Sequence, residues 1–239
     1  MTTGPRKAAS IVPDRWIDLV SGGVLTAGMD LGTTQKGTSN PTALAVIEKV
    51  APRYVCRLAL AWKTNNPDVT RAVIDKVLSD LAKAQKRLSR LPIDATNERF
   101  FAADLAKELA GKTVVDQIVA SENTTHRGEE MKWKLYLGNL LVNAIEGGEL
   151  VLPNEQWVRN HIRQVYREKG TFEADVDGQG NHADFFDALK LALHGQKVSG
   201  GPASAMGMSL SGGGKQPSNK KLPEVFTRML AAGKRLLNS

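Results

Sequence analysis

The fold of this chain is decided between residues 24 and 62, which read VLTAGMDLGTTQKGTSNPTALAVIEKVAPRYVCRLALAW. Three apolar runs, at 24–31, 42–49 and 54–62, are separated by a polar, glycine-containing loop and by a short turn with Pro52. Apolar runs of this length between glycine- and proline-containing turns are typical of strands. The stretch therefore predicts three consecutive antiparallel strands.

Beyond residue 62 the hydrophobic period becomes that of a helix. Asn66-Pro67-Asp68 is typical of a helix start, and apolar residues recur at helical spacing from Val69 to Leu88. Pro92 ends this helix and opens a short strand through Ala95. Strands that meander and then alternate with helices predict an α/β fold with a mixed sheet, covered by helices on both faces. The further expected elements are a helix at 98–110, a strand at 113–120, a long helix at 125–145, a brief strand at 149–152, a helix from 154 to about 168, an edge strand at 171–176 and a last helix at 182–194.

The composition is that of an ordinary globular protein. Of 239 residues, 41% are hydrophobic and 24% are charged. Cys56 is the only cysteine, which excludes an intramolecular disulfide and a cysteine-based zinc site. No apolar run approaches the roughly 20 residues that span a membrane, and no signal peptide is apparent. We therefore expect a soluble, intracellular protein with no membrane association.

Charge and composition divide the chain into four expected segments. The net charge is +7, and +6 of it follows residue 196, where seven Lys or Arg face a single acid. A basic tail of this kind suits contact with nucleic acid or with an acidic partner. The expected segments are an N-terminal arm at 1–23, a body at 24–197, a flexible Gly/Ser-rich linker at 198–221 and a basic amphipathic C-terminal helix at 222–239.

Three aspartates stand at the ends of separate expected elements. Asp30 closes the first apolar run, Asp94 closes Leu91-Pro92-Ile93, and Asp184 begins the last helix. Burying an unpartnered charge is costly, so carboxylates placed here need partners. A turn or helix-cap role is the alternative for each of them. If the three element ends converge, they form an oxygen-rich site that suits Mg²⁺ or Mn²⁺.

Carboxylates on neighbouring strand ends are typical of sites that cleave phosphodiesters with two divalent ions, about 3.5–4 Å apart. In such a site Asp30 is expected to bridge both ions, while Asp94 completes one and Asp184 the other. Asp187 lies one turn beyond Asp184 on the same helix face, as a fourth ligand or as a solvated acid. His182 is an accessory candidate that orients a ligand or contacts the scissile phosphate, with a polar helix-start residue as the alternative.

The order of these pieces resembles the nuclease domain of tailed-phage large terminases, which has the RNase H-like fold. The matching pieces are Gly28-Met29-Asp30 with the strand at 40–47, then 92–96, 148–153 and 180–192. The resemblance implies that Asp30, Asp94 and Asp184 are catalytic residues that bind Mg²⁺ or Mn²⁺. It also implies endonucleolytic cleavage of double-stranded DNA with little sequence preference, the cut that starts and ends genome packaging into the procapsid.

The chain departs from the family pattern after the second acid and in the last helix. The family often has a glycine where this chain has Asn97-Glu98, which makes Glu98 a candidate stand-in ligand. Asp187 occupies a position that is more usually apolar or aromatic, so the metal shell is expected to be larger here. No phosphate-binding loop of a packaging ATPase is present, because Lys215 lies in the expected linker. Either the packaging ATPase is therefore on another polypeptide, or this chain is a nuclease domain isolated from a larger protein that carries it.

Three other interpretations remain open from the sequence. The run from Gly28 to Thr34 also resembles the first phosphate loop of the actin and heat-shock ATPase superfamily, which needs two similar lobes and a second such loop. Holliday-junction resolvases share the RNase H-like fold and a similar first acid, but they need a dimer and four acids. The third interpretation is a non-catalytic module that docks on DNA or on a capsid component by charge alone.

Basic residues near the acids are the candidates for contact with DNA. Phosphate contacts are independent of base sequence and steeply salt-sensitive. A solvated surface stripe is the alternative. Further expected partners are the packaging ATPase, the portal protein and the small terminase subunit, in the cytoplasm of an infected host cell. The candidates for DNA contact are Lys36 in the loop after Asp30, then Arg127, Lys132 and Lys134 at the start of the long helix, and Arg159, Arg163 and Arg167, which are spaced to share one helix face.

Overall fold

The computed structural model describes residues 10–32, 40–176 and 182–198, and it confirms the predicted α/β class. No helix among these residues is long and apolar enough to cross a bilayer. The elements follow in the order η1 (Trp16–Leu19), β1 (Val24–Asp30), β2 (Thr42–Val50), β3 (Arg53–Trp62), α2 (Pro67–Lys83), β4 (Leu88–Asp94), α3 (Arg99–Glu108), β5 (Val114–Ile118), β6 (Asn123–His126), β7 (Glu129–Lys132), α4 (Trp133–Glu146), β8 (Leu150–Val151), α5 (Gln156–Arg163), β9 (Val165–Glu168), β10 (Thr171–Ala174) and α6 (Asp184–Lys197).

The central sheet has six strands in the order β5-β4-β1-β2-β3-β8. β1, β2 and β3 pair antiparallel, which confirms the predicted meander. β4 lies parallel to β1 on the other side, and β5 lies parallel to β4. Two separate hairpins, β6–β7 and β9–β10, stand outside this sheet. The chain thus forms the mixed sheet that its pattern of strands and helices predicts.

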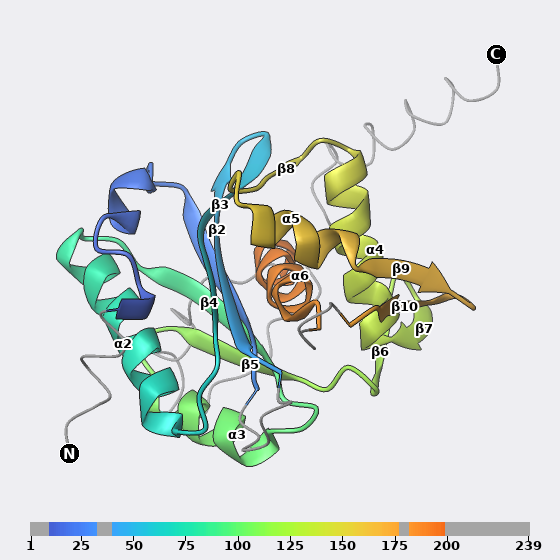
Figure 1. Cartoon of the computed structure of the whole chain (residues 1–239), viewed down its shortest axis with the longest axis horizontal. Helices are drawn as coiled ribbons and strands as arrows, with labels where there is room; N and C mark the ends of the chain where they lie inside the picture. The colour runs from blue at the N-terminus through green and yellow to red at the C-terminus, as the bar shows by residue number, and fades with distance from the viewer. Residues whose placement is uncertain (1–9, 33–39, 177–181, 199–239) are drawn as a thin grey trace, which may run out of the picture. The chain divides into compact units, whose positions relative to one another are not determined.

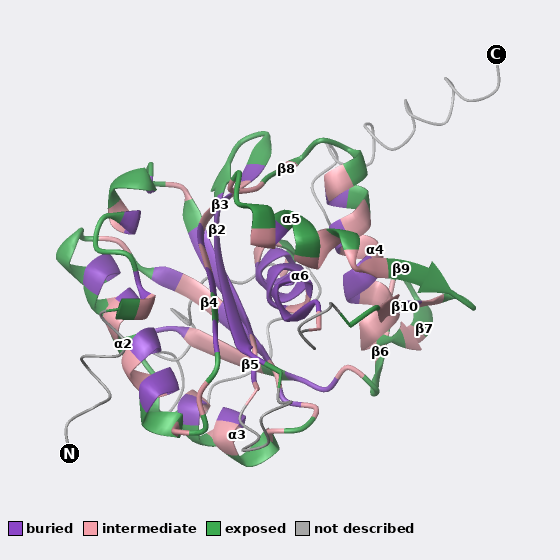
Figure 2. Cartoon of the chain, viewed as in Figure 1, coloured by how far each residue is buried: buried purple, intermediate pink, exposed green. Residues whose placement is uncertain are grey.

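Helices cover the two faces of the sheet, and a large hydrophobic core lies on each face (Figure 1). One core joins η1, α2 and α3 to the sheet, with Trp16, Val73 and Leu105 fully or nearly buried. The other core joins α4, α5 and α6 to the opposite face. α6 is buried almost along its whole length, as Figure 2 shows. A helix that is buried on so many sides holds its residues in fixed positions relative to the strands.

α6 approaches β1 closely because of a glycine in that strand. A Cβ atom at Gly28 would lie 2.1 Å from the carbonyl oxygen of Ala188 and 2.2 Å from the amide nitrogen of Ala192. The neighbouring Thr26 hydroxyl donates to the Ala192 carbonyl at 2.8 Å. Gly28 therefore serves close strand–helix packing.

A buried carboxylate ties the segment before β1 to the sheet. Glu48 of β2 accepts backbone hydrogen bonds from Ser21, Gly22 and Gly23, at 2.5–3.0 Å. Arg57 donates to the same carboxylate at 2.7 Å. The β2–β3 register shifts beside Arg57, so this residue is the extra one of a β-bulge, and its side chain reaches Glu48.

Three helix boundaries expected from the sequence were wrong. α2 ends at Lys83, because Gln85 takes a positive φ of 57° and leads the chain into β4. The long helix expected at 125–145 begins only at Trp133, since β6 and β7 pair around Gly128. The helix expected to continue to about residue 168 ends at Arg163, and 165–168 pairs with β10 instead. In both hairpins, pairing with a neighbouring strand outweighs helical periodicity.

Candidate metal and nucleic-acid site

Two of the predicted aspartates end neighbouring parallel strands. Asp30 is the last residue of β1, Asp94 is the last of β4, and the two stand opposite each other in the β1–β4 register. α6 packs across β1, β2 and β4 and contributes Asp184 and Asp187 from its first turn. All four carboxylates line one cleft of about 390 Å³, the acidic cleft. The structure therefore brings together three segments that are far apart in the sequence.

The walls of the acidic cleft come from the ends of β1 and β4, from α4 and α6, and from the β9–β10 hairpin. His182 also lines it. Glu98 is absent from the lining and occupies the N-cap position of α3, so the structure does not bring it to the other acids. Lys134 of α4 and Glu173 of β10 form an ion pair of 3.0 Å on one wall. The remaining lining residues are Leu31, Asn40, Thr96, Asn97, Ala120, Val165, Phe172, Ala174, Ala183, Phe186 and Lys190.

Burial and crowding make the carboxylates hard to ionise together. The pKa of Asp30 is raised well above its usual value, first by burial and then by the negative charges of Asp187, Asp94 and Asp184. Burial, followed by the charge of Asp187, raises the pKa of Asp184 to about 7. Like charges at close range disfavour the ionised forms, and a cation would relieve both effects.

Lys190 is a buried cation in the wall of the acidic cleft. Its side chain is 5% exposed and forms an ion pair with Asp187, one turn earlier on α6. Burial lowers the pKa of Lys190, but the charge and hydrogen bond of Asp187, together with Asp94 and Asp30, outweigh this effect and raise it. Lys190 in turn opposes the upward pKa shift of Asp30. The lysine ammonium therefore balances part of the negative charge.

The donor set of the acidic cleft fits a divalent ion. Oδ2 of Asp184 is buried and has no hydrogen-bond partner within the described ranges, which is costly for a carboxylate oxygen. Oxygen ligands from several carboxylates are those that Mg²⁺ and Mn²⁺ prefer. In this arrangement, no three His, Cys, Asp or Glu side chains of the described residues are grouped closely enough to hold an ion by themselves. The charges of Asp187, Asp94 and Asp30 all act on Lys190, so its ammonium lies close to these acids.

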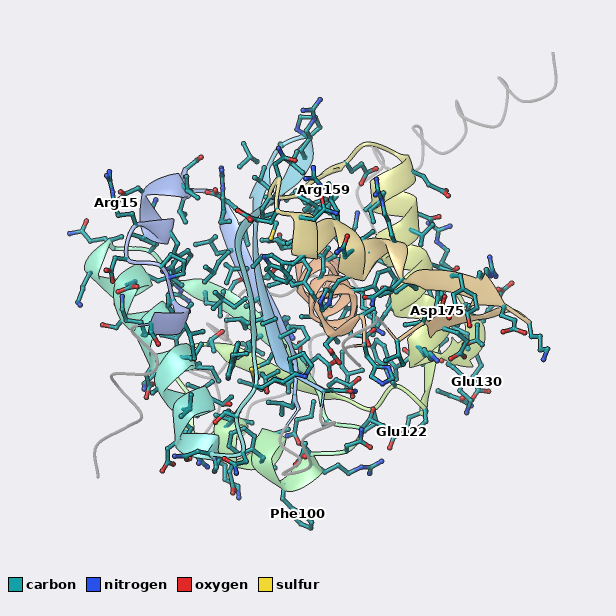
Figure 3. The ribbon with its side chains drawn as sticks, in the orientation of Figure 1. Arg15, Phe100, Glu122, Glu130, Arg159 and Asp175 are labelled. Atoms are coloured by element: carbon teal, nitrogen blue, oxygen red, sulfur yellow. The ribbon has the colours of Figure 1, made fainter. Side chains whose placement is uncertain are left out.

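The predicted DNA-contact residues are dispersed over several elements. Arg127 lies in the β6–β7 turn at φ 54°, and Lys132 precedes α4, so their placement in a long helix was wrong. Arg159 and Arg163 lie on the exposed side of α5, where Arg159 is labelled in Figure 3, whereas Arg167 belongs to β9. The single helix face expected for the three arginines does not exist. Lys36 lies outside the described residues, and among the described members of this set only Lys134 lines the acidic cleft.

Sequence reasoning missed several polar residues of the acidic cleft, among them Lys190, Thr96 and Glu173. Lys190 follows Asp187 by three positions on one helix, and this spacing is a signal that could have found it. Thr96 follows Asp94 by two positions, which is typical of a side chain that bonds back to an acid. Glu173 carried no signal, because only tertiary packing brings β10 against α4.

Comparison with known proteins places this geometry in a family. No curated protein matches the sequence. The nuclease of the large terminase of thermophilic phage G20c is similar in structure, with a TM-score of 0.52, 16% identity, and coverage of 72% of this chain and 81% of that one. The same nuclease with bound magnesium has a TM-score of 0.52 and 15% identity, with coverage of 72% of this chain and 80% of that one. A mutant nuclease domain of the large terminase subunit gp2 of bacterial virus Sf6, solved with manganese and beta-thujaplicinol, is also similar. Its TM-score is 0.52 and its identity 12%, with coverage of 80% of this chain and 96% of that one.

These likenesses show that the fold is RNase H-like, with a mixed sheet between two helical layers. The sequence model of the terminase RNase H-like domain matches residues 27–195, which is more than half of the chain and contains all four aspartates. The chain therefore belongs to the terminase RNase H-like domain family.

Proposed function

We propose that this protein is the DNA endonuclease of a phage packaging terminase, which cuts double-stranded DNA with little sequence preference. Asp30, Asp94 and Asp184 are the proposed ligands of two Mg²⁺ or Mn²⁺ ions, with Asp187 as an additional ligand. The observation that carries the proposal is the Asp30–Asp94 pair at two parallel strand ends. In the same cleft lies an Asp184 oxygen that has no hydrogen-bond partner among the described residues. Related nucleases have been solved with magnesium and with manganese.

The chain's own residues have distinct parts in the proposed reaction. Bound ions would supply an activated water and stabilisation of the leaving oxygen. Asp30 and Asp94 hold positions fixed by the β1–β4 register, and Asp184 and Asp187 approach from the helix packed on those strands. Lys190 offsets their charge until an ion binds. His182 lines the cleft and is proposed to contact the scissile phosphate.

Binding of the DNA backbone is proposed to involve basic residues around the cleft. Lys134 lines the cleft together with the acids, and it would exchange its partner Glu173 for a phosphate. Such contacts are independent of base sequence and weaken as salt concentration rises. The other proposed contacts are Lys36, Arg127, Lys132, Arg159, Arg163 and Arg167. The proposed partners are the packaging ATPase domain or subunit, the portal protein and the small terminase subunit, in the host cytoplasm.

Plasmid cleavage tests the proposal. The protein with Mn²⁺ should nick and then linearise supercoiled plasmid, and Asp30→Asn or Asp184→Asn should abolish cleavage. Asp104→Asn is a matched control, because Asp104 is a 54% exposed acid of α3 outside the acidic cleft, and its cleavage should equal that of the wild type. Plasmid that stays intact at every Mn²⁺ and Mg²⁺ concentration would contradict the proposal.

The same preparation separates the other interpretations. A Holliday-junction resolvase should prefer a branched junction to linear duplex by a large factor. An ATP-binding module should gain thermal stability with ATP and Mg²⁺. A docking module should bind DNA without cutting it and should lose binding when 199–239 are deleted.

A further inference from the structure

Asp94 is held by hydrogen bonds from one neighbouring residue. Its Oδ1 accepts from the backbone amide of Thr96 at 2.8 Å and also from the Thr96 hydroxyl. Two donors on one oxygen occupy the two lone-pair directions that a carboxylate oxygen offers in its plane. Oδ2 is therefore the oxygen of this carboxylate that is available for further interactions in the cleft.

The direction of the hydroxyl bond is fixed by its other partner. Oγ1 of Thr96 also accepts from the backbone amide of Ala120 at 3.0 Å. The amide of Ala120 can only donate and an ionised carboxylate can only accept, so the single proton of the Thr96 hydroxyl points to Asp94. When Asp94 is ionised the bond is charge-assisted, which makes it stronger than a bond between neutral groups.

Ala120 is itself fixed by the surrounding backbone. Its carbonyl accepts from the amide of Lys134 at 3.0 Å, and Ala95 donates to Ile118 at 2.8 Å. Thr96 therefore connects the end of β4 to the segment that leads from β5 toward α4. Thr96 and Ala120 both line the acidic cleft beside Asp94.

We propose that Thr96 is a positioning residue, which fixes Asp94 as a metal ligand through a single oxygen, Oδ2. This inference rests on the proposed metal site but is separate from it, since a cleft could bind ions without this constraint. Without the hydroxyl, Oδ1 keeps only the hydrogen bond from the Thr96 amide, so the Asp94 carboxylate is held less firmly and the orientation of this ligand is less fixed. Residues that hold a ligand by hydrogen bonds typically change metal affinity by about 10- to 100-fold when they are removed.

Mn²⁺ titration calorimetry on the full chain without DNA tests this role. Thr96→Val keeps the side-chain shape but removes the hydroxyl, and it should weaken Mn²⁺ binding by about tenfold or more. Thr96→Ser keeps the hydroxyl and should restore an affinity close to that of the wild type. Thr64→Val is the matched control, because Thr64 likewise accepts from a backbone amide, that of Asn66 at 3.1 Å, but lies outside the cleft. It should leave Mn²⁺ affinity unchanged.

The outcomes distinguish this inference from the proposed function. Wild-type Mn²⁺ affinity in a folded Thr96→Val protein would overturn the role of Thr96 and leave the nuclease proposal intact. No Mn²⁺ binding by the wild type would overturn both. If Thr96→Val does not fold, a crystal structure of the wild type with Mn²⁺ decides. Coordination by Asp94 Oδ2, with Oδ1 still bonded to Thr96, is expected, and coordination by Oδ1 would overturn the inference.

Discussion

Replacement of Lys190 by methionine tests whether the acidic cleft depends on its internal cation when no metal is bound. Methionine keeps an unbranched side chain of similar length and removes the charge. Breaking a buried ion pair by removing one partner costs roughly 3–5 kcal/mol. Lys190 is 5% exposed but its partner Asp187 is 39% exposed, so we expect the lower end, about 3 kcal/mol. For a domain of this size, that loss corresponds to a Tm lower by about 6–12 °C.

Thermal unfolding followed by circular dichroism, with EDTA or with Mn²⁺, measures this effect. Mn²⁺ should raise the Tm of Lys190→Met more than that of the wild type, because the ion replaces the missing charge and meets no competing ammonium. Saturation at 100 times the dissociation constant contributes about 2.7 kcal/mol. Lys107→Met is a matched control, since Lys107 pairs with Asp104 at the same helical spacing but is 78% exposed. Its Tm should barely change, as for other exposed pairs.

Two results would refute this reasoning about Lys190. One is a Tm in EDTA within a degree of the wild-type value. The other is an equal gain of Tm from Mn²⁺ in the variant and the wild type. Either result would mean that the four carboxylates are neutralised by protons, and that the ammonium contributes little.

Three further predictions concern pH and packing. The pKa of Asp184 is raised to about 7, so in EDTA its contribution to stability is complete below about pH 4 and is lost as pH rises through 7. Urea unfolding midpoints measured from pH 4 to 8 should therefore fall with pH in the wild type, and Asp184→Asn should remove this fall in the midpoint. Burial lowers the pKa of His194 to about 4, so the unfolded protein binds more protons at this residue between pH 4 and 6.5, and stability rises with pH in that range. His194→Leu should remove this rise in stability. An unchanged slope of stability against pH would contradict the burial of a neutral imidazole. Gly28→Ala would place a Cβ 2.1 Å from the Ala188 carbonyl oxygen. We therefore expect the free energy of unfolding, measured in urea, to fall by at least the roughly 1–3 kcal/mol typical of overpacking. An unchanged urea midpoint would show that α6 can move away from β1 without cost.

The sheet could be predicted from the sequence because its signals are local. The apolar runs that became β1, β2 and β3 are bounded by glycine and proline, and such runs have few alternatives to strands. The hairpins could not be predicted in the same way. Residues 125–132 have a composition that a helix tolerates, and only pairing of β6 with β7 around Gly128 decides otherwise. The same holds for Arg167, which the β9–β10 pairing removes from the helix of Arg159 and Arg163.

The sequence by itself determined which acids are candidates, because Asp30, Asp94 and Asp184 each stand where a regular element begins or ends. Only the tertiary structure decided that they meet, since the β1–β4 register and the packing of α6 on Gly28 set positions that are distant in the chain. It also decided what surrounds them: Lys190 as a buried cation, Thr96 as the donor to Asp94, and Glu173 opposite Lys134. Charge balance and hydrogen-bond direction depend on distances of a few ångströms in space, and spacing along the sequence fixes those distances only within a single helix or turn.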